Sequence, residues 1–131
     1  MRWDRYCCGR LPNSELSGAL SRCYPRTAKI AAVASFHGGW LHTEEPTSAH
    51  TALPRIKARL YFAHAVQDRS MPKEAIEKFE QALAAWGGKY ESETYAGALH
   101  SWTTLDSPVY NKEHAERAFG KLTELFKATL Q

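Results

Sequence analysis

Apolar residues lie along the chain in short continuous runs that alternate with stretches of helical spacing. The runs at residues 30–36 and 60–66 have the length of a strand, and each ends in polar or glycine-rich loop residues. A short continuous run, such as the one at residues 30–36, is typical of a strand that is buried on both faces. A third strand is predicted at about residues 90–95, where aromatic and β-branched residues follow two glycines.

Two longer segments carry apolar residues at helical spacing. The first covers residues 72–86, with Ser70 as its expected cap and Gly87-Gly88 as its stop signal. The second begins after Asn111, which can cap it. Its apolar stripe consists of Ala115, Ala118, Phe119, Leu122, Leu125 and Phe126. The intervening residues 40–55 lack periodicity and predict a loop with a short helical turn at about residues 48–53.

Alternation of strands with helices predicts an α/β fold with a parallel sheet of about three strands and flanking helices. At 131 residues the chain has the length of one domain, which we place at residues 1–131. Residues 1–29 are rich in Arg, Ser, Cys and Pro and have only a weak helical pattern, so their order stays open. The sharper pattern is confined to residues 30–131.

Composition excludes several classes of protein. With 44% hydrophobic and 24% charged residues and a net charge of +3, the chain has no basic cluster for a nucleic acid. No run has the roughly 18 apolar residues of a membrane span, and no apolar segment near Met1 predicts a signal peptide. Three cysteines, two of them adjacent, make a poor disulfide framework, so a cytoplasmic location is expected.

Asp68 and His100 each follow a predicted strand, 32 residues apart with a helix between them. The carboxyl ends of parallel strands meet at one edge of a sheet, where catalytic side chains collect. A buried carboxylate there can accept the imidazole Nδ1–H and orient the ring for acyl transfer. Alternatively, Asp68 caps the following helix or its loop, and His100 is an ordinary loop histidine.

A nucleophile for such a pair must lie upstream, and Cys7 is the candidate. The segment Tyr6-Cys7-Cys8-Gly9-Arg10 partly matches the nucleophile elbow G-x-[SC]-x-G. Gly9 supplies one of the two small residues, whereas Arg5 stands in place of the other. A thiolate at a helix N-terminus would have a lowered pKa and could attack an ester carbonyl. The alternative is an unstructured N-terminal cysteine.

Four histidines, His37, His42, His50 and His64, suggest a metal site at first sight. Their spacings do not match the i,i+4 pairs or short motifs that usually ligate zinc, so no metal or cofactor is predicted.

Three residues near the strand ends are candidates for a substrate pocket. His37 is expected near the mouth of the site, and Trp40 and Trp102 could line an apolar pocket. The two tryptophans could equally lie in the core or be exposed.

Several segments of this chain resemble the C-terminal half of a dienelactone hydrolase. The segments that carry the resemblance are residues 7–10, 31–39, 65–68, 95–100 and 106–118. The resemblance implies a partial α/β-hydrolase fold and a catalytic triad of Cys7, Asp68 and His100, with the backbone N–H of Cys8 as an oxyanion donor. It further implies hydrolysis of a small ester or lactone without metal or cofactor.

The chain departs from the family pattern in three respects. Family members are longer, so the N-terminal half of the fold, including a loop that supplies one oxyanion donor, is expected to be missing. Residues 10–29 match the helix after the elbow poorly, and residues 101–104 lack the arginine that holds a substrate carboxylate. The alternative function is therefore an inactive truncated remnant that self-associates, for example as a homodimer, through the exposed edge of the strand at residues 30–36.

Overall fold

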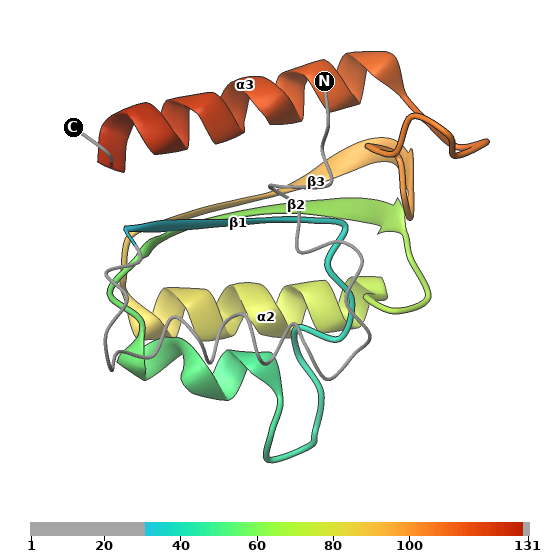
Figure 1. Cartoon of the computed structure of the whole chain (residues 1–131). Helices are drawn as coiled ribbons and strands as arrows, with labels where there is room; N and C mark the ends of the chain where they lie inside the picture. Colours follow the sequence, from blue (N-terminus) through green and yellow to red (C-terminus); the bar gives the residue numbers. More distant parts are fainter. Residues whose placement is uncertain (1–30, 130–131) are drawn as a thin grey trace.

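The computed structural model of the chain describes residues 31–129 (Figure 1). The elements, in chain order, are the strand β1 (Ala32–Phe36), the 3₁₀ helix η2 (Ala49–Arg55), the strand β2 (Arg59–Gln67), the helix α2 (Lys73–Trp86), the strand β3 (Tyr90–Leu99) and the helix α3 (Lys112–Thr129). All three predicted strands and both predicted helices are confirmed. The third strand runs four residues further than its predicted end at residue 95.

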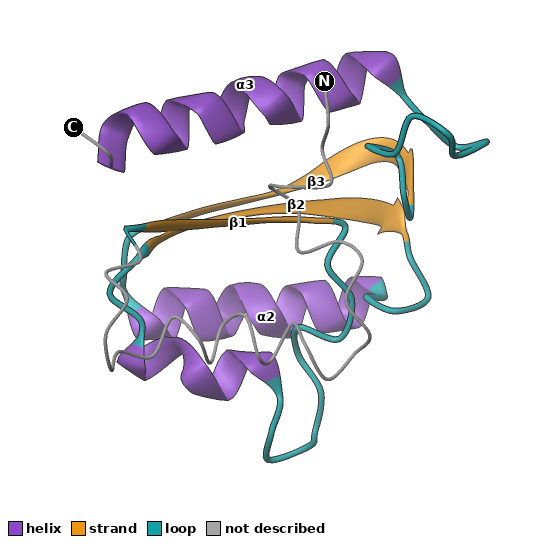
Figure 2. Ribbon diagram, viewed as in Figure 1, coloured by secondary structure: helices purple, strands orange, loops and turns teal. Residues whose placement is uncertain are grey.

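The three strands form a parallel sheet in the order β1-β2-β3, which confirms the predicted fold class. Helix α2 and η2 lie on one face of the sheet and α3 lies on the other (Figure 2). Because successive side chains of a strand point to opposite faces, β2 contributes to both cores. Leu60 and Phe62 pack with Phe79 and Leu83 of α2, and Tyr61 packs on the α3 side. The largely apolar run of β2, interrupted only by His64, therefore reflects burial on both faces.

The helix ends only partly match the expected capping residues. Asn111 caps α3 as predicted, since its Oδ1 accepts a hydrogen bond from the His114 N–H at 3.0 Å. Gly87 ends α2 in the left-handed conformation with φ 68°, and its N–H donates to the Leu83 carbonyl. The prediction that Ser70 caps α2 is wrong. The capping residue is Pro72, which makes no side-chain capping bond. The Ser70 hydroxyl does not reach the helix, because it donates to Asp68 instead.

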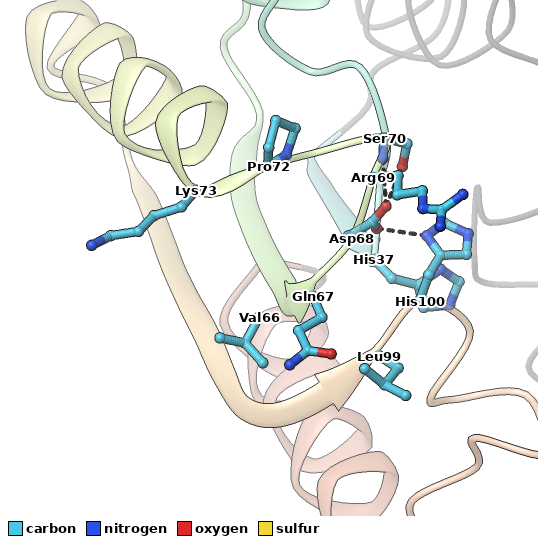
Figure 3. A pocket seen from close by; sticks show the side chains of 11 residues that line it. His37, Val66, Gln67, Asp68, Arg69, Ser70, Pro72, Lys73, Leu99 and His100 are labelled. Atoms are coloured by element: carbon cyan, nitrogen blue, oxygen red, sulfur yellow. Dashed lines mark hydrogen bonds and ion pairs between the residues drawn. The ribbon is translucent and has the colours of Figure 1, made fainter.

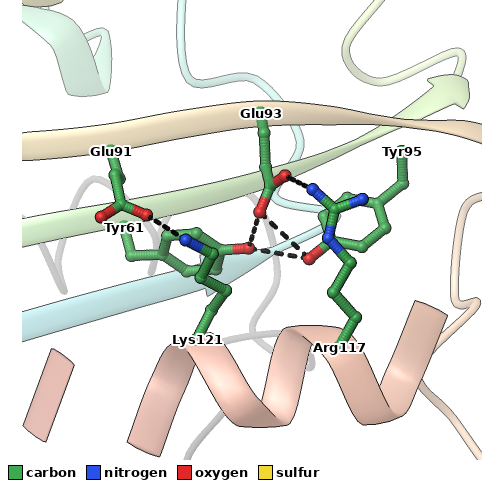
Figure 4. A network of polar contacts seen from close by, with 6 residues as sticks. All are labelled: Tyr61, Glu91, Glu93, Tyr95, Arg117 and Lys121. Atoms are coloured by element: carbon green, nitrogen blue, oxygen red, sulfur yellow. Dashed lines mark hydrogen bonds and ion pairs between the residues drawn. The ribbon is translucent and has the colours of Figure 1, made fainter. Parts of the chain in front are cut away.

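A polar network fastens α3 to the sheet (Figure 4). The Tyr61 hydroxyl donates to Glu93 Oε1 at 2.7 Å and lies 2.9 Å from the Tyr95 hydroxyl. Arg117 of α3 donates to the other oxygen of Glu93 and lies 4.9 Å above the Tyr95 ring. Burial raises the pKa of Tyr61, and its bond to Glu93 adds to this, so the phenol stays protonated. The network satisfies polar groups that the α3 core would otherwise leave without partners.

Backbone conformations outside the usual regions gather at the carboxyl edge of the sheet. Among the described residues other than glycine, three have positive φ: His37 (42°), Trp40 (55°) and Ser101 (74°). His37 and Trp40 follow β1, and Ser101 follows β3. Residues in this region are sparse and tend to cluster at functional sites, so this edge is where a site is expected.

Among residues 31–129, no helix is both long and apolar enough to cross a membrane.

Candidate active site

Asp68 and His100 are hydrogen-bonded at the carboxyl edge of the sheet (Figure 3). His100 Nδ1 donates to Asp68 Oδ2 over 2.6 Å. Asp68 directly follows β2, and His100 directly follows β3. The two strands are neighbours, so the loops that leave them bring residues 32 positions apart into contact. The structure thus brings this pair together as the sequence indicated.

A shift in strand register makes the contact possible. Ala65 lies opposite Tyr95, and an uninterrupted register would place Gln67 opposite Gly97. Gln67 instead lies opposite Leu99, because β3 accommodates two extra residues around Gly97, whose φ is 75°. Bulges commonly re-aim side chains next to active sites. This one moves His100, rather than Ala98, next to Asp68.

The second carboxylate oxygen of Asp68 is held by its own loop. Oδ1 accepts hydrogen bonds from the Ser70 N–H at 2.8 Å and from the Ser70 hydroxyl at 2.5 Å. The side chain of Asp68 is only 3% exposed. Asp68 therefore makes both contacts that the sequence left open, since Oδ1 organises the loop and Oδ2 binds the histidine.

The electrostatics of the pair favour a carboxylate and a basic imidazole. Burial by itself would raise the pKa of Asp68, but the hydrogen bonds from His100 and Ser70 outweigh it and lower that pKa. The bond to Asp68 raises the pKa of His100, and burial opposes this only in part. An ionised Asp68 requires a proton on His100 Nδ1, so the Nε2 lone pair of neutral His100 is the available base.

An open pocket surrounds the pair and is lined by the loops after β1, β2 and β3. Its lining includes His37, Val66, Ser70 and Leu99. His37 is 5% exposed and its ring lies against that of His100, with ring centroids 4.8 Å apart. The expected place of His37 near the site thus agrees with the structure.

Neither tryptophan lines this pocket. Trp102 is fully buried and stacks on Tyr95 with ring centroids 4.6 Å apart, so of the alternatives that the sequence left open for it, the core is confirmed and the pocket is wrong. The left-handed Ser101 reverses the chain after His100 and directs Trp102 into the core. Trp40 is 47% exposed and does not belong to the pocket wall.

Two polar partners at the site were not predicted from the sequence. Ser70 holds Asp68, and the spacing Asp-x-Ser is the signal that could have indicated it, since Asp side chains often bond the backbone two residues on. The Thr103 hydroxyl and His37 Nε2 are hydrogen-bonded at 3.0 Å. No sequence signal pointed to Thr103, because this contact depends on the turn after β3.

The remaining histidines lie elsewhere. The rings of His42 and His50 stack at 3.9 Å, and His64 is buried against α2 with Nε2 3.1 Å from the Ser92 hydroxyl. Within residues 31–129, no group of three His, Cys, Asp or Glu side chains is arranged to hold a metal ion. Cys7 and Cys8 lie outside the described residues.

Comparison with known proteins shows which family the sequence of this chain matches. Residues 6–130 match the model of the dienelactone hydrolase family. A Synechocystis protein with the provisional name carboxymethylenebutenolidase is 30% identical over 105 residues, which are 78% of this chain and 43% of that relative. An Escherichia coli (strain K12) protein with the same provisional name is 36% identical over 61 residues, or 47% of this chain and 22% of the relative.

Solved structures agree on the fold. A crystal structure of a provisionally named dienelactone hydrolase from Klebsiella pneumoniae has a TM-score of 0.67 and 20% identity. The superposition covers 74% of this chain and 42% of that one, so the present chain corresponds to part of an α/β-hydrolase fold. The matched part is likewise less than half the length of either curated relative. From these matches and the geometry of its strand ends, we conclude that the chain belongs to the dienelactone hydrolase family.

Proposed function

We propose that this chain hydrolyses small esters or lactones by acyl transfer, with Cys7, His100 and Asp68 as its catalytic residues. The observation that carries the proposal is the 2.6 Å bond between His100 and Asp68 in an open pocket at the carboxyl edge of the sheet. A buried carboxylate that fixes the tautomer of a half-exposed histidine is the arrangement that acyl-transfer hydrolases use to activate a nucleophile.

In the first half of the proposed reaction, His100 Nε2 takes the proton from the Cys7 thiol. The thiolate attacks the carbonyl carbon, and the oxyanion of the tetrahedral intermediate accepts a hydrogen bond from the Cys8 backbone N–H. When the intermediate collapses, the ester C–O bond breaks and the leaving alcohol takes the proton from His100. The product of this half is a thioester on Cys7.

In the second half, His100 removes a proton from water, and the hydroxide formed attacks the thioester carbonyl. Collapse releases the carboxylic acid and returns the proton from His100 to the Cys7 sulfur. Asp68 stays ionised throughout and stabilises the His100 imidazolium that forms twice. No oxidant, metal or cofactor is needed to balance these steps.

The family supports the substrate class in coarse terms. The provisional name of both curated relatives refers to a butenolide, which is an unsaturated lactone. Ester and lactone carbonyls react by the same acyl-transfer chemistry, so a simple activated ester is a suitable first probe.

The nucleophile can be tested with a matched pair of cysteine variants. We expect the full chain to hydrolyse p-nitrophenyl acetate with saturation kinetics, Cys7→Ala to abolish turnover, and Cys23→Ala to leave it unchanged. Mass spectrometry after rapid quenching should find the acetyl group on the peptide that contains Cys7. Equal turnover in the two variants would contradict the assignment of Cys7.

A non-catalytic role is the second candidate, and one observation favours it. Among residues 31–129, β1 is an edge strand that pairs with β2, and an edge strand is where a second chain could add to the sheet. An inactive chain of this kind should dimerise in sedimentation experiments and should hydrolyse the ester no faster than its His100→Ala variant does.

A further inference from the structure

We propose that His37 is a positioning residue for His100, on whose proposed function as general base this inference rests. Its ring confines the His100 ring to the orientation in which Nδ1 meets Asp68 and Nε2 faces the substrate. The family comparisons assign no role to His37, and the acyl-transfer steps do not use it.

The first supporting observation is the contact between the two rings. The ring of His37 meets that of His100 edge-on, with an interplanar angle of 67° and centroids 4.8 Å apart (Figure 3). The His100 side chain is 46% exposed, so one hydrogen bond to Asp68 would otherwise be its main restraint against rotation. A buried aromatic wall on one side of the ring removes rotamers that turn Nε2 away.

The second observation is that His37 is itself held firmly. Its backbone N–H donates to the Ala63 carbonyl at 2.7 Å, and its Nε2 bonds the buried Thr103 hydroxyl at 3.0 Å. The side chain of Trp102, from the same turn as Thr103, also packs near the His37 ring. His37 therefore connects the end of β1 to the turn that carries His100, and a rigid wall of this kind is what precise positioning requires.

The third observation concerns charge. Burial and, to a smaller extent, the His100 charge together lower the pKa of His37 to about 4, although Asp68 opposes the shift. Nδ1 of His37 is buried and has no hydrogen-bond partner among residues 31–129, which suits a bare lone pair better than an N–H group. At neutral pH His37 is therefore an uncharged ring, which does not repel the His100 imidazolium that forms during acyl transfer.

Two substitutions distinguish the effect of the aromatic ring of His37 from the effect of its nitrogen atoms. His37→Phe keeps the aromatic wall, whereas His37→Asn removes it. Asn also suits the left-handed backbone at φ 42°, so a loss in this variant does not stem from backbone strain. If thermal melts show that the Asn variant is unfolded, His37→Gly removes the ring and tolerates the same backbone.

The decisive readout is the tautomer of His100, measured in the full chain from its ring ¹⁵N chemical shifts above its pKa. We expect the Nδ1–H tautomer in the native chain and in His37→Phe, and a mixture of tautomers in the ring-free variant. In parallel, kcat for p-nitrophenyl acetate should fall about 10- to 100-fold in the ring-free variant, with KM little changed. In His37→Phe, kcat should stay close to that of the native chain.

Retention of the Nδ1–H tautomer in a folded ring-free variant would overturn the inference, as would its loss in a folded His37→Phe. The tautomer is measured without turnover, so this result is independent of the proposed function. A chain that hydrolyses no ester yet shows the expected tautomers would refute the proposed function and leave the positioning role of His37 intact.

Discussion

Gln67 lies opposite Leu99 in the sheet, two residues beyond the partner that the pairing of Ala65 with Tyr95 would give it. The next residue on each strand is Asp68 on one side and His100 on the other, and these two side chains are hydrogen-bonded. An unshifted register would place Ala98 at the position that His100 occupies. The site therefore depends on an irregularity in β3 as much as on the residues that it joins.

Gly97 is the residue on which this irregularity depends. Its φ of 75° is costly for any residue with a Cβ, so we expect Gly97→Ala to lower the free energy of unfolding by about 1–2 kcal/mol. Within the described part of the chain nothing lies within 4 Å of the new Cβ, so we attribute the loss to backbone strain. Gly120→Ala is the matched control. Gly120 lies in α3, no other part of residues 31–129 comes within 4 Å of a Cβ at this position, and the substitution should stabilise the chain by about 0.5–1 kcal/mol.

Urea unfolding of the two variants measures both effects. Gly97→Ala should also reduce ester hydrolysis, since the strained strand end carries His100. Stabilisation by both substitutions would contradict the account of the bulge.

Replacing Asp68 by Asn should change both the rate and its pH dependence. We expect kcat to fall about 10³- to 10⁴-fold, because an amide neither fixes the tautomer of His100 nor stabilises its imidazolium. The pKa of His100 is raised by its bond to Asp68, and the base must be neutral, so native activity should rise with pH through a pKa above 6.5. In Asp68→Asn the remaining activity should rise at a lower pH.

A pH profile of kcat/KM for both proteins provides the measurement. An inflection at the same pH in both would show that Asp68 does not control His100.

The hydroxyl of Tyr61 should contribute to the docking of α3. Tyr61→Phe removes the donor to Glu93 and the partner of Tyr95, so we expect the free energy of unfolding to fall by about 1–3 kcal/mol. Tyr90→Phe is a suitable control, because Tyr90 packs its ring against Trp86 on the opposite face of the sheet, away from α3. The two variants should differ clearly in urea midpoint, and equal midpoints would contradict a stabilising role of the network.

His64 should make the fold sensitive to mild acid. Burial lowers its pKa to about 4, whereas the unfolded chain binds the proton near 6.5, so stability falls as pH drops from about 6.5 to about 4. The difference between these pKa values corresponds to about 3 kcal/mol at full protonation. His64→Leu should remove this part of the acid sensitivity.

In the native chain the Ser92 hydroxyl donates to Glu80, and it can still do so in the leucine variant. Thermal melts of both proteins between pH 7 and pH 4 should therefore show a larger fall in melting temperature for the native chain than for His64→Leu. Parallel curves would show that His64 is not the group that titrates.

The sequence predicted the layers of this fold because burial imposes a clear pattern on β2, α2 and α3. It also predicted the contact of Asp68 with His100, since parallel strands deliver their ends to one edge. The bulge at Gly97 could not be foreseen, because glycine inside a strand pattern is compatible with several backbone paths. The position of Trp102 stayed open between pocket and core for a related reason, since the left-handed Ser101 that turns it into the core leaves no mark in residue type.

The most direct test of the central claim is steady-state hydrolysis of p-nitrophenyl acetate by the full chain, His100→Ala and His42→Ala, measured side by side. His42 stacks on His50 and is not part of the pocket wall, so its removal controls for loss of a histidine as such. We expect native rates from His42→Ala and background rates from His100→Ala. Equal rates in all three proteins would contradict the claim that His100, held by Asp68, is the base of an acyl-transfer site.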